Sequence, residues 1–100
     1  MIDKTLVPVG GLKKEPFSGE HHGMRYFFYA DEDKTSFSVS IFPDPWSFDK
    51  TPDTEKVTHS FSMTEDGMDQ AIEWLFEMYD KQKEKWDYAY EHRMQTLLNQ

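Results

Sequence analysis

The stretch TEDGMDQAIEWLFEMYDKQKEKWDYAYEHRMQTLLNQ, residues 64–100, decides the fold, because no glycine or proline interrupts its amphipathic pattern after Gly67. At 100° per residue, eight of its apolar residues share one stripe as wide as a core-facing helix face. They are Met68, Ile72, Leu75, Tyr79, Trp86, Tyr90, Met94 and Leu97. Thr64 is a suitable N-cap, and acids follow it where the helix dipole favours them. The pattern predicts a helix over residues 64–100.

This helix is longer than the sheet that it would cover. A seven-residue strand spans about 23 Å, which a helix crosses in about 15 residues, so roughly 30 Å is left over. Three arrangements are open: a break near 80–85 that folds the helix back, packing on the N-terminal arm and the Trp46 loop, or projection onto a second subunit. The absence of glycine and proline in the polar run 80–85 argues against a sharp break. An apolar stripe without a covering surface predicts an interface.

Upstream residues show the alternation of antiparallel strands. Residues 24–30 are rich in aromatics, and residues 36–42 place Phe37, Val39 and Ile41 on one face and serines on the other. The acidic stretch 31–34 between them fits a hairpin turn. Residues 56–63 alternate in the same way and predict a third strand.

The remaining segments carry proline and glycine. Pro8 limits residues 5–9 to an edge strand or an extended arm. Residues 13–23 and 43–54 are punctuated by glycine or proline and predict loops.

These elements predict one α+β domain over residues 1–100: an antiparallel meander of three to four strands, with a long C-terminal helix packed across one face. Residues 1–63 supply the sheet and loops, and residues 64–100 the helix. Of the two faces of residues 24–30, either the Tyr26/Phe28 face or the Phe27/Tyr29 face could point inward. The expected core is Tyr26, Phe28, Phe37, Val39, Ile41, Val57, Phe61, Met68, Ile72, Leu75 and Tyr79.

Composition supports a folded chain, because 16% of the 100 residues are aromatic. The chain has no cysteine, which excludes disulfides and thiolate metal sites. No apolar run approaches the roughly 18 residues of a membrane span, and the first residues lack the order of a signal peptide. We therefore expect a cytoplasmic protein with no membrane partner.

A net charge of −8 disfavours binding to nucleic acid, because the chain repels phosphate backbones. The same charge admits an acidic mimic of nucleic acid that blocks a basic protein. Lys81, Lys83, Lys85 and Arg93 interleave the acids of the predicted helix and weaken that hypothesis.

Histidines are the candidates for chemistry. His21 and His22 follow Glu20, but adjacent histidines in an extended chain point apart, and no metal-binding spacing is present. His59 lies on the apolar face of its strand, where a general base would still need a partner and a pocket. Trp46 and Phe48 could edge a shallow aromatic pocket, or could pin their loop to the core. A small enzyme or ligand binder that uses residues 20–22 with His59 is therefore the alternative function.

The leading hypothesis is a non-catalytic interaction module that forms a homodimer or docks on a protein partner through residues 80–100. It assigns no catalytic residue, metal or cofactor. Trp74 and Tyr88 lie away from the main stripe, and aromatics in register are enriched at interfaces. The expected partner-binding residues are Trp74, Trp86, Tyr88, Tyr90, Met94 and Leu97.

Four short segments read together carry a family resemblance. They are Lys4-Thr-Leu-Val-Pro-Val-Gly10, Lys14-Glu-Pro-Phe-Ser-Gly19, His22-Gly-Met-Arg-Tyr26 and Trp74-Leu75. The chain resembles, over most of residues 4–80, a group of small uncharacterised proteins from gut Firmicutes, some of which are labelled acetyltransferase. It lacks the Gln/Arg-x-x-Gly-x-Gly/Ala turn that such acetyltransferases use for coenzyme A. The resemblance implies a bacterial cytoplasmic origin and little about activity.

Overall fold

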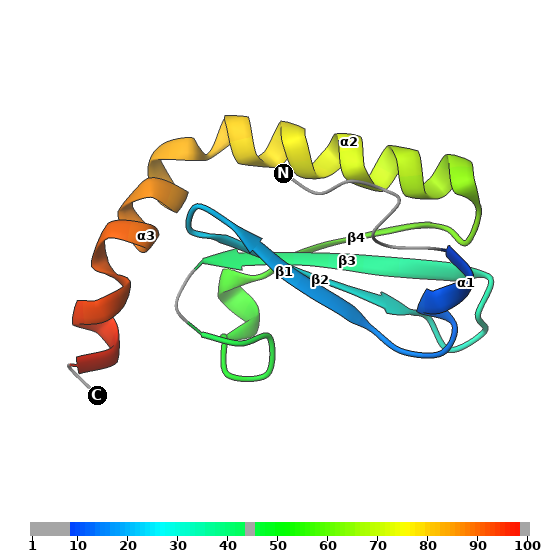
Figure 1. The fold of residues 1–100 in the computed structure, drawn as a ribbon, viewed down its shortest axis with the longest axis horizontal. Helices are drawn as coiled ribbons and strands as arrows, with labels where there is room; N and C mark the ends of the chain where they lie inside the picture. The colour runs from blue at the N-terminus through cyan, green and yellow to red at the C-terminus, as the bar shows by residue number, and fades with distance from the viewer. Residues whose placement is uncertain (1–8, 44–45, 99–100) are drawn as a thin grey trace.

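The computed structural model describes residues 9–43 and 46–98, in which one sheet carries helices on one face and at one end (Figure 1). A short helix, α1 (Val9–Leu12), precedes four antiparallel strands in the order β1-β2-β3-β4. The strands are β1 (Phe17–His21), β2 (Met24–Ala30), β3 (Ser36–Pro43) and β4 (Val57–Ser62). Two helices, α2 (Glu65–Lys81) and α3 (Lys83–Leu98), complete the chain. The predicted α+β meander is confirmed, with four strands.

The β2–β3 hairpin forms where the alternation predicts it, with Ala30 opposite Phe37. Its acidic turn is closed by hydrogen bonds, because the hydroxyls of Ser36 and Ser38 both donate to the Asp31 carboxylate. The prediction of a loop over residues 13–23 is wrong, since β1 lies within it and pairs with β2. The predicted strand or arm at residues 5–9 falls mostly outside the described residues, and Val9 belongs to α1.

The core lies between the sheet and α2, and it uses the Tyr26/Phe28 face of β2. Most of the expected core residues are buried, but Ile72 and Tyr79 are half-buried and Val57 is exposed. The prediction that Val57 belongs to the core is wrong, because Val57 is the first residue of the edge strand β4. The expected core left out several other residues that are buried: Leu12, Met24, Phe42, Ala71 and Trp86.

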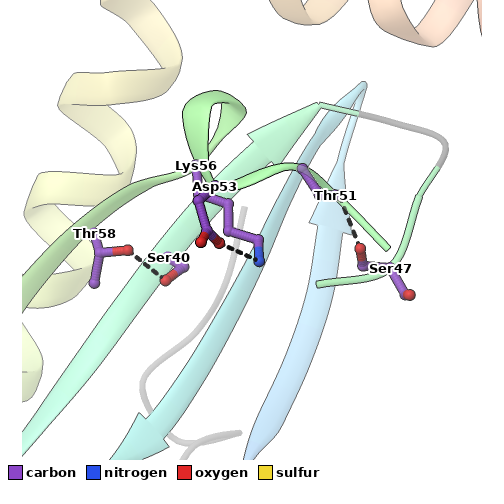
Figure 2. A network of polar contacts seen from close by, with 6 residues as sticks. All are labelled: Ser40, Ser47, Thr51, Asp53, Lys56 and Thr58. Atoms are coloured by element: carbon purple, nitrogen blue, oxygen red, sulfur yellow. Dashed lines mark hydrogen bonds and ion pairs between the residues drawn. The ribbon is translucent and has the colours of Figure 1, made fainter. Parts of the chain in front are cut away.

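The serine face of β3 is covered rather than solvent-exposed, because Ser38 and Ser40 are buried there. Their hydroxyls bond across to β4, Ser40 to Thr58 at 2.7 Å and Ser38 to Ser60 at 3.0 Å. Figure 2 shows Ser40 and Thr58 close to the loop over residues 46–56, which includes the short 3₁₀ helix η2 (Asp53–Glu55). Cross-strand hydroxyl bonds satisfy these polar groups, which allows a serine-rich strand to be covered.

The start of α2 is as predicted. Thr64 has extended backbone angles, and its hydroxyl accepts a hydrogen bond from the amide of Gly67 at 3.0 Å. Gly67 is required at this position, because a Cβ there would come within 1.9 Å of the Ser62 carbonyl oxygen. The glycine therefore allows β4 to pass closely into α2.

Of the three arrangements that the sequence leaves open, the structure has the break near 80–85, because α2 is followed by a break at Gln82. The lack of glycine and proline in this run, which argued against a sharp break, did not prevent it. There α2 ends, and α3 runs down past the end of the sheet that holds the β1–β2 turn (Figure 1). Residues 80–85 have no apolar side chain whose packing would stabilise a straight helix through this region. The break instead brings Trp86 into the core, where none of its surface is exposed. Burial of this large side chain accounts for a break without glycine or proline.

Candidate functional site

The β1–β2 turn holds the beginning of α3. Only His22 and Gly23 separate the paired residues His21 and Met24, and both have positive φ, as a two-residue hairpin turn requires. The His22 ring stacks on Tyr90 with 4.3 Å between centroids. Its Nε2 lies 3.2 Å from Oδ1 of Asp87. The turn therefore fixes the direction in which α3 leaves the body.

Trp86 anchors α3 from the inside. Its indole Nε1 donates a hydrogen bond to the Met78 carbonyl at 3.3 Å, and its ring is fully buried. The polar tip of a buried tryptophan needs such a partner. The prediction that Trp86 binds a partner is therefore corrected: in this fold the side chain offers no surface to another molecule.

Beyond Trp86, one side of α3 becomes steadily more exposed. Tyr90 is 36% exposed, Met94 59% and Leu98 77%. These residues are spaced by four and so form one stripe along the helix, here called the α3 stripe. Leu97, also expected at an interface, lies in α3, but its side chain is outside the described residues. Leu98 belongs to the α3 stripe, although it was not among the eight stripe residues predicted from the sequence.

The two aromatics off the main stripe have different surroundings. Trp74 is half-buried and packs beside Phe61 and His59, with ring centroids 6.0 and 5.7 Å away. Tyr88 is 65% exposed and stacks on His92 at 4.0 Å. They do not form a joint surface, because Trp74 belongs to α2 and covers β4, whereas Tyr88 belongs to α3 beyond the break.

The histidines do not converge. His21 lies on β1 and His59 on β4, the two edges of the sheet, so three strand spacings of nearly 5 Å each separate them. His21 packs edge-on against Tyr79 at 4.8 Å, and burial lowers the pKa of His21. Among residues 9–43 and 46–98, no group of three or more His, Asp or Glu side chains could hold a metal ion.

Phe48 pins its loop to the sheet. Its ring stacks on Phe27 at 4.6 Å, and Lys56 Nζ lies 4.0 Å above it. A hollow of about 410 Å³ lies beside it. The hollow is lined by Ser18, Gly19, Glu20, Arg25, Tyr26, Phe27, Phe42, Ser47, Phe48 and Asp49. Trp46 is half-buried and is not among these residues. Because Phe27 and Lys56 pack against the ring of Phe48, this residue holds its loop on the sheet.

Comparisons of the chain with protein-family models, curated proteins and solved structures gave no match. None of the described helices has both the length and the apolar character to cross a membrane.

Proposed function

We propose that this chain is a non-catalytic interaction module that docks on a partner protein through the α3 stripe. The supporting observation is the exposure gradient from Tyr90 through Met94 to Leu98, at the end of α3 that extends beyond the sheet (Figure 1). Apolar residues at i, i+4 and i+8 on a helix are the pattern that inserts into a hydrophobic groove.

The size of the α3 stripe favours a groove over a paired helix. Taking about 200 Å² for each side chain, the exposed fractions of Tyr90, Met94 and Leu98 amount to roughly 350 Å². A stable interface needs about 800 Å² from each partner. Two copies of α3 laid side by side would fall short of that area. A groove that surrounds the helix also covers its flanks, so a concave partner suits this short stripe better than a second α3 does.

Charge further restricts the partner. Residues 94–98 carry no charge, whereas the exposed Glu91 lies one helical turn before Met94. Arg93 on the same turn is directed at the Tyr90 ring, 3.8 Å from its centroid. A groove with an apolar floor and a basic rim would complement the stripe and the acid beside it.

Photo-crosslinking in the source cell tests this proposal. A photoreactive residue at Met94 or Leu98 is expected to link to the same partner protein. The same residue at Tyr88, which is also exposed but lies outside the α3 stripe, is the control. Met94→Glu should weaken the complex about tenfold or more by placing a charge in an apolar groove, and Gln95→Glu should leave it nearly unchanged. Equal yields at all three positions, or no product at 94 and 98, would contradict the proposal.

A further inference from the structure

The outer edge of β4 is the least protected edge of the described sheet. β4 is an end strand in the order β1-β2-β3-β4, and every one of its residues except Phe61 is exposed. Residues 57–64 contain no charged side chain, although 30% of the chain is charged. Proteins usually protect an edge strand with charges, proline or a bulge. β4 carries neither a charge nor a proline.

The opposite edge differs. β1 has only five residues, and Glu20 places a charge among them. The Tyr26 side chain also crosses over Gly19, where an added Cβ would lie 2.6 Å from the tyrosine hydroxyl. In a chain with a net charge of −8, a contact between two copies must use a surface that lacks acids. This requirement selects β4 over β1.

The hydrogen-bond pattern gives the direction of the free main-chain groups. Met63 N donates to Thr35 O of the neighbouring hairpin at 3.0 Å, so the odd-numbered residues of β4 direct their main-chain groups toward β3. The even-numbered residues Thr58 and Ser60 consequently direct theirs outward. This alternation leaves outward donors and acceptors near the middle of the strand, where an added strand can pair.

The strand is also complementary to itself. In an antiparallel pair with its two-fold axis at Ser60, Thr58 of one copy would face Ser62 of the other, hydroxyl against hydroxyl. On the other face His59 would meet Phe61, ring against ring. Neither pairing opposes like charges, and aromatic cross-strand pairs are favourable. An isologous contact requires this kind of self-match.

We propose that β4 pairs antiparallel with β4 of a second copy, which joins the two sheets into one of eight strands. The pairing extends the hydroxyl contacts Ser38–Ser60 and Ser40–Thr58 across the junction. Two groups compete with it: His59 Nδ1 lies 2.9 Å from Ser60 O, and Thr64 N donates to Ser62 O at 2.8 Å. Both carbonyls must be released before the second strand can pair. This dimer does not depend on α3, so the proposed docking function could fail without affecting it.

The mass of the full chain in solution tests the proposal, measured by light scattering at about 100 µM, well above a micromolar dissociation constant. Wild type is expected near twice the 11.9 kDa of one chain. Ser60→Pro removes an outward amide, which an edge strand tolerates, and should give a folded monomer. Ser60→Ala keeps that amide and should remain a dimer.

Two further variants keep the result interpretable. His59→Lys puts a charge on the exposed edge and should also give a monomer, which decides the matter should Ser60→Pro fail to fold. Met94→Glu alters only the α3 stripe and should remain a dimer. A monomeric wild type would overturn the proposal. So would a dimer that persists in both edge variants, or one that is lost with Met94→Glu alone.

Discussion

The backbone of Gly23 lies directly against the carbonyl of Trp86, so that a Cβ at Gly23 would come within 1.8 Å of the Trp86 oxygen. Gly23 also has a φ of 93°, which L-residues rarely adopt. Gly23 therefore serves two purposes: it adopts the positive φ of the β1–β2 turn, and its lack of a side chain allows α3 to pack closely against the turn.

Gly23→Ala should lower the free energy of unfolding by roughly 2–4 kcal/mol, because strain at positive φ adds to a clash with backbone atoms that cannot turn aside. Urea denaturation measures the loss. Gly10→Ala is the matched control, since nothing lies within 4 Å of a Cβ at Gly10, and it should cost almost nothing. Equal losses in the two variants would contradict the close packing of the turn on α3.

Trp86→Ala should cost about 3–5 kcal/mol, because it empties the site of a fully buried aromatic ring. Tyr88→Ala removes an exposed ring two residues away and should change the unfolding free energy by no more than about 0.5 kcal/mol. Thermal or urea unfolding compares the two variants. A mild effect of Trp86→Ala would place this residue outside the core.

Acid should destabilise the fold through His21. Burial lowers its pKa in the folded state below the ordinary value of 6.5. Between these two pKa values the unfolded chain binds more protons, so the free energy of unfolding falls as the pH falls through that window. His21→Asn removes the effect and should lose less stability than wild type between about pH 7 and about pH 5. Parallel slopes for the two proteins in urea titrations would refute this role.

Phe48→Ala should loosen the loop over residues 46–56 while the rest of the fold persists. The variant loses the stacking on Phe27 and the contact of Lys56 with the ring, which together hold the loop on the sheet. Limited proteolysis should cut this loop several times faster than in wild type. Asp49→Ala, an exposed change in the same loop, should leave the cleavage rate near that of wild type.

Periodicity predicted the hairpin, the third strand and the capped start of α2, because each depends on a local pattern. Ser36 to Phe42 alternates with a period of two, and Thr64 stands where a helix needs an oxygen acceptor. β1 was missed because Phe17-Ser-Gly-Glu-His21 has little apolar alternation. Its pairing comes from the two-residue turn at His22 and Gly23, a signal that the sequence did contain.

The break at Gln82 could not be read from breaker residues, because tertiary burial of Trp86 overrides local helix preference. Trp86 shares one helical stripe with Tyr90 and Met94. Because buried and exposed residues on a helix can have the same spacing, the spacing alone could not show that Trp86 is buried. The candidate site was thus predicted in part. Tyr90 and Met94 are exposed as an interface requires, whereas Trp86 belongs to the body. Deleting residues 84–100 would consequently remove Trp86 from the core and destabilise the fold.

Protection of the Trp86 indole N–H tests most directly whether α3 is anchored within one chain and leaves only its far side for a partner. Hydrogen exchange of the ¹⁵N-labelled indole, assigned with Trp86→Phe, would be followed over a hundredfold range of protein concentration. Strong protection that does not change with concentration is expected, because the Met78 carbonyl accepts a hydrogen bond from this indole N–H within one chain. Rapid exchange in dilute solution, with protection only on association, would contradict the account.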